Sequence, residues 1–158
     1  KMKKYTALQA AQWFLCKESM TVGKLQVLCY YAYAWTLVFL NKRKTRKYRL
    51  FEEPFQGWVH RPVCPLLQDK YREYGFNEIP RYKGGTEGFT DSVETVLESV
   101  WHTYGKFDED QLTRIVYSEE PFQRARAGLK PWESGYRVIQ DKDMYRYYKG
   151  LLNGTPKE

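Results

Sequence analysis

Few residue types in this chain could carry out catalysis. The 158 residues include two histidines, His60 and His102, and three cysteines, Cys16, Cys29 and Cys64. A thiol nucleophile needs a base within hydrogen-bond reach, oriented by a third group, and only His60 and Cys64 lie close enough in the sequence to be considered. Four residues across a strand, a proline and a helix is not a recognised arrangement for that chemistry. We therefore expect no enzyme, and interpret His60 as a residue that hydrogen-bonds the backbone of a turn.

A metal or phosphate site has equally little support. The scattered histidines and cysteines supply no pair at the spacing of zinc ligands, and the acidic run Asp108–Asp110 suits the start of a helix. Gly84 and Gly85 lack the lysine and hydroxyl residue that follow in a phosphate-binding loop. We expect no metal and no cofactor. The odd number of cysteines argues against a disulfide framework and fits a reducing cytoplasm.

The clearest charge feature is the basic run Lys42–Arg49. The net charge of the chain is +7, and six of its lysines and arginines lie in this run, so the excess is local. Such a run can hold nucleic-acid phosphates while a tyrosine stacks on a base; the side chains concerned are Lys42, Arg43, Lys44, Arg46 and Tyr48. The interpretation that we favour is a solvated loop between a helix and a ribbon.

A second nucleic-acid feature would be a helix-turn-helix over Asp108–Tyr117 and Glu119–Gly128. In that arrangement Gln123, Arg124 and Arg126 could face a DNA groove. Two carboxylates at the start of the second helix would, however, meet the DNA backbone, which disfavours binding. Packing is the better explanation of this helix pair.

The hydrophobic pattern predicts a mainly helical fold. Thr6 and Gln9 form a capping box ahead of the first helix, and Thr21 can cap a second helix that is apolar nearly all round from Leu25 to Leu40. A helix without a polar face is usually central and covered by its neighbours. Its 16 apolar-rich residues are fewer than the roughly 20 that span a bilayer, so we expect no membrane anchor.

Short extended segments follow the second helix. Tyr48–Phe51 and Phe55–His60 predict a small β-ribbon, and Pro62 suits the first turn of a helix that Gly75 ends. Later helices are expected from Thr90 or Asp91 to Gly105, from Asp108, from Glu119 and from Asp141. Together they predict one compact domain of about seven helices over residues 5–152, followed by a frayed polar tail at 153–158.

The order of several short motifs resembles one known family. Lys24-Leu25-Gln26 is followed by Tyr30-Tyr31-Ala32, and Trp58-Val59-His60 by Pro62-Val63. With the stretches around Trp101, Pro121 and Val138–Tyr148, this order is similar to that of the Panacea domain, the group of SocA-like antitoxins and the phage-associated protein GepA. The similarity extends from Tyr5 to about Leu152.

The resemblance implies a compact, mainly helical and non-enzymatic protein that neutralises a protein toxin in a bacterial or prophage toxin–antitoxin pair. One branch of the family is an adaptor that hands its toxin to the ClpXP protease. The chain departs from the family pattern at Arg61, where glycine is usual, and at Tyr117 and Phe122, where histidine and tryptophan are usual. Gln140 replaces the usual serine or threonine before the last helix, so Asp141 is expected to cap that helix.

Two sets of residues therefore carry the functional prediction. The expected partner-binding residues are Trp58, His60, Arg61, Lys42, Arg43, Lys44, Arg46 and Tyr48. The expected structural signature is Leu25, Tyr30, Tyr31, Trp58, Pro62, Val63, Trp101 and Pro121. Trp58 belongs to both sets, because the corner it forms could either be packed as a scaffold or be exposed as a contact for a partner.

Overall fold

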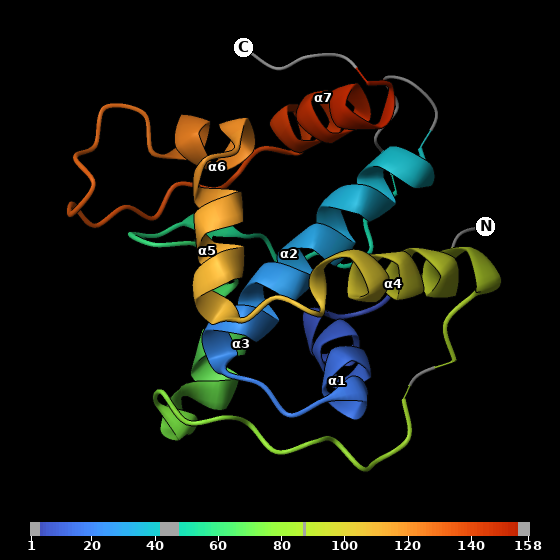
Figure 1. The fold of residues 1–158 in the computed structure, drawn as a ribbon. Coiled ribbons are helices and arrows are strands. Elements are labelled where there is room, and N and C mark those ends of the chain that lie inside the picture. Colours follow the sequence, from blue (N-terminus) through green and yellow to red (C-terminus); the bar gives the residue numbers. More distant parts are fainter. Residues whose placement is uncertain (1–3, 42–47, 87, 155–158) are drawn as a thin grey trace.

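Seven α-helices and a two-stranded antiparallel ribbon make up the described part of the chain (Figure 1). The structure is a computed structural model that describes residues 4–41, 48–86 and 88–154. The mainly helical class predicted from the sequence is confirmed. The elements are α1 (Ala7–Lys17), α2 (Val22–Phe39), β1 (Gln56–Gly57), β2 (Pro62–Val63), α3 (Pro65–Tyr71), the 3-10 helix η1 (Arg72–Tyr74), α4 (Asp91–Tyr104), α5 (Glu109–Tyr117), α6 (Glu120–Ala125) and α7 (Asp141–Leu152).

Helix α2 crosses the middle of the molecule, and its neighbours cover it (Figure 1). Helices α1, α3, α4, α5 and α7 and strand β2 all pack against it. Side chains on every side of α2 are buried, among them Leu25, Tyr30 and Tyr31 with no exposed surface. The prediction of a central apolar helix is confirmed. Among the described residues, no helix is both long and apolar enough to cross a bilayer.

The predicted helix starts are correct at four positions. Thr6 and Gln9 form the capping box of α1, and the hydroxyls of Thr21 and Thr90 accept hydrogen bonds from backbone N–H groups in the first turns of α2 and α4. Asp108 forms a second capping box, with Gln111, at the start of α5. These short-range bonds satisfy N–H groups that no helix can pair internally, which is why the sequence alone identifies them.

The predicted ribbon exists: β1 lies within the predicted segment Phe55–His60, whereas its partner strand is Pro62–Val63 and not Tyr48–Phe51. Gln56 pairs with Val63 and Gly57 with Pro62, so residues 58–61 form the hairpin turn and not a strand. Tyr48–Phe51 is not a strand either. Pro62 belongs to β2, and α3 begins three residues later, with Pro65 in the first-turn position expected for Pro62. Pro62 can take part in the strand because a proline lacks only the N–H group, which an edge position does not need.

The predicted capping role of Asp141 is wrong. Gln140 occupies the cap position of α7 without a side-chain capping bond, and Asp141 is the first helical residue. Its carboxylate accepts hydrogen bonds from the Tyr33 hydroxyl (2.7 Å) and from Nε of Arg49 (2.8 Å). The Asp141 carboxylate thus pairs with the distant Arg49, whereas the local sequence pattern predicts that it caps α7.

Candidate partner-binding surface

Residues of the ribbon turn and of the long connection between α6 and α7 surround a surface hollow of about 220 Å³. We call it the Trp58 hollow; its lining includes Trp58, His60, Arg61, Gln68, Gly135 and Tyr136. The Trp58 indole N–H donates to the side-chain oxygen of Gln56 (2.8 Å), and its ring meets that of Tyr136 edge to face, with 5.7 Å between centroids. Trp58 is half-buried and His60 is exposed. Both predicted aromatic residues therefore border a concave surface.

Arg61 is engaged inside the molecule. Its guanidinium donates to the Glu109 carboxylate (2.8 Å) and to the Thr113 hydroxyl (3.1 Å), both on α5. The same carboxylate accepts from the hydroxyl of Thr21, the cap of α2 (2.6 Å). Arg61 thus joins the ribbon turn to α5 directly and to the start of α2 through the Glu109 carboxylate.

Of the other predicted contact residues, the structure describes only Tyr48, which does not line the hollow. Tyr48 is buried, and its backbone N–H donates to the side chain of Asn41. Lys42, Arg43, Lys44 and Arg46 lie outside the described residues. Of the predicted signature residues, Leu25, Tyr30, Tyr31, Pro62, Val63 and Pro121 are buried, whereas Trp101 is half-buried beneath the ammonium group of Lys24.

The connection between α6 and α7 projects from the body of the molecule (Figure 1) and carries exposed aromatic side chains that sequence reasoning missed. Trp132 is 72% exposed and Tyr136 is 62% exposed. The available signal was a tryptophan and a tyrosine in the polar, turn-rich stretch 129–136, where no core position is expected. Exposed aromatic residues are frequent hot spots of protein interfaces.

A buried arginine holds this connection in place. Arg126, 5% exposed, donates to the carbonyl oxygens of Gly57 (3.1 Å), Lys130 (3.0 Å) and Glu133 (2.6 Å). Gly135 lies so near that a Cβ there would be 3.1 Å from Nη1 of Arg126. Because its guanidinium is used internally, Arg126 is not available to face a DNA groove.

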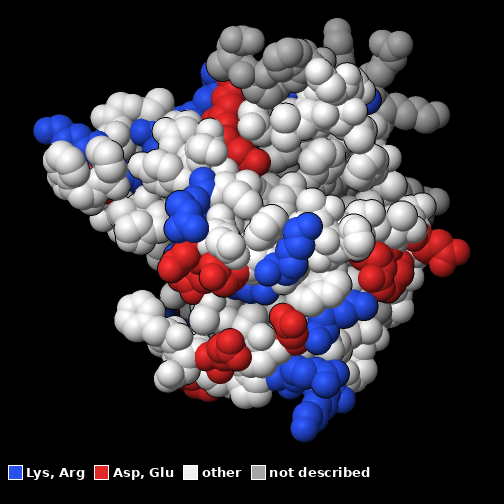
Figure 2. Space-filling model, in the orientation of Figure 1, with Lys and Arg blue, Asp and Glu red and all other residues white. Residues whose placement is uncertain are grey.

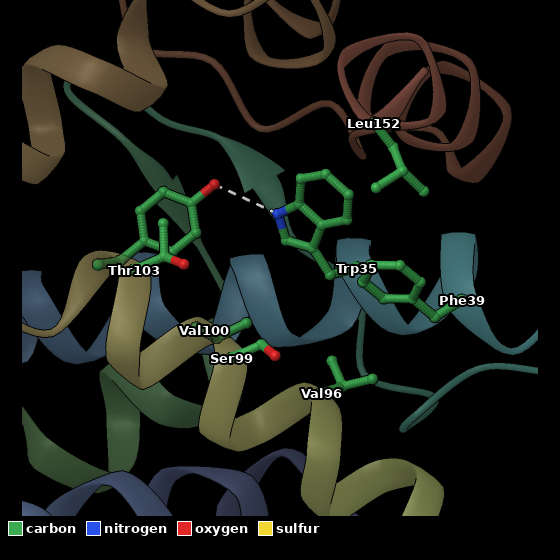
Figure 3. A pocket seen from close by; sticks show the side chains of 8 residues that line it. Trp35, Phe39, Val96, Ser99, Val100, Thr103 and Leu152 are labelled. Carbon is green, nitrogen blue, oxygen red and sulfur yellow. Dashed lines mark hydrogen bonds between the residues drawn. The ribbon is translucent and has the colours of Figure 1, made fainter. Parts of the chain in front are cut away.

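A second concave region lies between α2, α4 and α7 (Figure 3). Trp35 and Phe39 of α2, Val96 and Val100 of α4 and Leu152 of α7 converge on an apolar groove of about 160 Å³. At one end the Trp35 indole N–H donates to the Tyr104 hydroxyl (3.2 Å). Phe39 and Leu152 are about half exposed, at 48% and 51%. No motif predicted this groove, because its walls come from three helices far apart in the sequence.

A buried carboxyl group, that of Glu119, is linked to the groove through Tyr31 and Tyr104. One oxygen of Glu119 accepts from the hydroxyls of Tyr31 (2.9 Å) and Tyr148 (2.6 Å), and the Tyr31 ring stacks on Tyr104 at 3.9 Å. Burial raises the pKa of Glu119 to about 7, although the two tyrosine hydrogen bonds act in the opposite direction. Buried charge without a cationic partner is costly, and the proton relieves that cost.

The single catalytic pairing considered from the sequence has unfavourable geometry. Cys64 is fully buried, whereas His60 is exposed. Burial raises the pKa of the Cys64 thiol, whereas a nucleophilic cysteine needs its pKa lowered. Among residues 4–41, 48–86 and 88–154, no group of three or more His, Cys, Asp or Glu side chains could hold a metal ion.

Charge on the visible face is mixed in sign. Figure 2 shows basic and acidic side chains interspersed over the lower half of the face that it presents, with no single basic field among the coloured residues. Among the described residues, some opposite charges pair with each other, as Lys17 does with Glu98 and Arg146 with Glu120, each at 3.2 Å. This described face therefore adds little to a phosphate-binding surface.

Comparison of the chain with protein-family models, with curated proteins and with solved structures found no match.

Proposed function

We propose that this protein is an antitoxin-like binding protein that neutralises a partner protein toxin. The observation that carries the proposal is the Trp58 hollow with its exposed aromatic rim, held rigid by Arg126. Rigid aromatic side chains around a hollow supply contact area at low entropic cost, which is what a protein interface needs. The motif order that resembles the Panacea domain supports a toxin as the partner.

The first experiment is co-expression with the adjacent gene. The adjacent gene should arrest bacterial growth when expressed alone, co-expression with this protein should restore growth, and the two products should copurify. The double variant Trp58→Ala with Tyr136→Ala should lose at least tenfold in affinity and fail to restore growth. A harmless neighbour that does not copurify would refute the proposal.

Neutralisation could proceed by occlusion of the toxin or by its delivery to ClpXP, as one branch of the resembling family does. We propose occlusion as the primary mode and delivery as the second. The half-life of the toxin in cells with and without ClpXP separates them, since only delivery makes the half-life depend on both this protein and the protease.

The alternative function is nucleic-acid binding through the basic run Lys42–Arg49. The sequence observation that favours it is the local concentration of charge. Binding to duplex DNA should then weaken steeply with salt, because each neutralised phosphate releases counterions. Replacing Lys42, Arg43, Lys44 and Arg46 with alanine should abolish that salt dependence. Unchanged DNA binding by the quadruple variant would exclude the run as the binding element.

A further inference from the structure

The two-stranded ribbon has a third, neighbouring extended segment. The backbone N–H of Gly57 donates to the carbonyl of Arg137 (2.9 Å), and that of Ile139 donates to the carbonyl of Phe55 (2.8 Å). Gln56 and Val138 form an antiparallel bridge between these two bonds. The order across the strip is therefore β2, β1 and residues 137–139, which lie far apart from the ribbon in the sequence.

The inner edge of this strip is closed by a side chain. The amide of Gln26, on the central helix α2, accepts from the backbone N–H of Cys64 (2.8 Å) and donates to the Cys64 carbonyl (3.1 Å). Gln26 thus provides the bonds of one further strand residue. Pro62, also on this edge, has no N–H group to be satisfied.

The outer edge is open. Because the Arg137 carbonyl and the Ile139 N–H point toward β1, both backbone groups of Val138, which lies between them, point away from it. Continued alternation of the extended chain directs the backbone groups of Tyr136 to the same outer side. The Val138 carbonyl accepts one bond from the side chain of Gln140, at 3.3 Å. Within the described part of the chain, the Val138 N–H and both backbone groups of Tyr136 have no hydrogen-bond partner.

A hollow lies at each end of this open edge. Tyr136 lines the Trp58 hollow. Val138 and Gln140 line a second hollow, with Tyr33, Arg49 and Asp141. Ile139, 1% exposed, anchors the edge in the core, whereas Tyr136 and Val138 are 62% and 41% exposed. The edge is thus fixed in position while its backbone and alternate side chains remain accessible.

We propose that residues 136–138 form a docking edge to which an extended segment of the partner protein adds as a further strand. This inference rests on the proposed function and specifies how the toxin is held. Strand addition supplies affinity through backbone hydrogen bonds and specificity through pockets for alternate side chains. The partner segment would place a large apolar side chain in the Trp58 hollow and a polar one at the Arg49 end.

A second copy of this chain is the other candidate to bind the edge at residues 136–138, and its charge disfavours that association. Each copy carries a net charge of +7, so self-association brings like charges together. A segment of a different protein avoids that repulsion.

The test uses two variants at one position and the protein encoded by the adjacent gene as the probe. Val138→Pro removes the outward N–H, which makes no internal bond, whereas Val138→Ala removes only the side chain. We expect the proline variant to bind at least tenfold more weakly than the alanine variant. In the wild-type complex, the amide protons of Tyr136 and Val138 should exchange with solvent at least tenfold more slowly than in the free protein.

The possible outcomes separate the two proposals. If the wild-type protein forms no complex, the proposed function fails and this inference fails with it. If a complex forms but the proline variant binds within twofold of the alanine variant, only the docking edge is refuted. Should the proline variant fail to fold, by circular dichroism, the amide exchange of the wild-type complex decides. A wild-type dimer that the proline variant loses would assign the edge to a second copy and also refute the inference.

Discussion

At the scale of single residues, the most informative group is the carboxyl of Glu119. It lies 8% exposed between α2 and α7, bonded to two tyrosine hydroxyls and to no described cation. Such a group links protonation to folding, because the folded and unfolded states bind the proton with different affinity.

The first prediction concerns the pH dependence of stability. The folded state raises the pKa of Glu119 from 4.5 to about 7, so it binds the proton more tightly than the unfolded chain does. The contribution of Glu119 to stability therefore falls as pH rises from about 4.5 to about 7, by roughly 3 kcal/mol at most. Glu119→Gln keeps an oxygen that accepts hydrogen bonds from the tyrosines but does not ionise. Residue 119 should therefore cause no fall in the stability of this variant as pH rises.

Urea denaturation at pH 5 and at pH 8 gives the free energy of unfolding of the wild type and of Glu119→Gln. The gain of the glutamine variant over wild type should be larger at pH 8 than at pH 5. An equal difference at the two pH values would show that Glu119 titrates as in an unfolded chain.

The second prediction concerns Arg126. Arg126→Met leaves the carbonyl oxygens of Gly57, Lys130 and Glu133 without their charged donor, and bonds of this type contribute about 1.5–3 kcal/mol each when intact. Because the effects within one cluster are not additive, we expect a loss of roughly 2–4 kcal/mol in the free energy of unfolding. Limited proteolysis should then cleave within residues 129–136 faster than in wild type.

A matched control is Arg114→Ala on the exposed side of α5, which should change stability by less than about 0.5 kcal/mol. If Arg126→Met were no more sensitive to protease than this control, Arg126 would not be what orders the connection.

At the scale of elements, the junction of α2 with α5 depends on close approach at Gly23. A Cβ on Gly23 would lie 2.4 Å from Cδ of Glu109. A side-chain end can usually move aside, but this carboxylate is held by Thr21 and by Arg61. The turn that carries Trp58 and His60 is thus coupled to the packing of two helices.

The third prediction tests that coupling. Gly23→Ala should destabilise the protein by about 1–2 kcal/mol, even though alanine favours a helix by about 1 kcal/mol over glycine. Glu109→Ala should also destabilise it, since the bonds to Thr21 and Arg61 are lost. Because the alanine methyl fills the space that the carboxylate leaves, the double variant should be more stable than the sum of the two losses predicts.

The measurement is a double-mutant cycle by thermal or urea unfolding. Strict additivity of the two single changes would contradict a direct steric contact between residue 23 and Glu109.

At the scale of the whole molecule, two surfaces compete for the role of partner interface. The Trp58 hollow and the groove between α2, α4 and α7 are both concave and have exposed apolar rims. Exposed apolar surface of this kind often marks an interaction site. Our proposal assigns the partner to the Trp58 hollow.

The fourth prediction compares the two surfaces in one binding assay. The groove variant Phe39→Gln with Leu152→Gln should bind the adjacent-gene product within twofold of wild type. The variant Trp58→Ala with Tyr136→Ala should lose at least tenfold. Both pairs are partly exposed, so circular dichroism and thermal unfolding should first establish that each variant is folded. The reverse pattern of affinities would move the interface to the groove.

The sequence predicts the helices of this protein better than it predicts the residues of the candidate site. The helices α1, α2, α4 and α5 follow from their caps and apolar periodicity, because those signals act over a few residues. The start of α3 is expected at Pro62 and lies at Pro65, because both prolines carry the same local signal for the first turn of a helix. Only the pairing of Gln56 with Val63 decides between them.

The sequence by itself determined the central apolar helix and most helix starts, and it proposed Trp58 and His60 as contact residues while placing them on a strand where the structure has a turn. Tertiary structure alone decided that Arg61 is engaged by Glu109, that Arg126 orders the connection with Trp132 and Tyr136, and that Val138 lies at an open edge. The physical reason is the separation along the chain of the residues that interact. A cap or an apolar stripe is satisfied by neighbours in the chain, whereas ion pairs, hollows and sheet edges join residues that only the folded chain brings together.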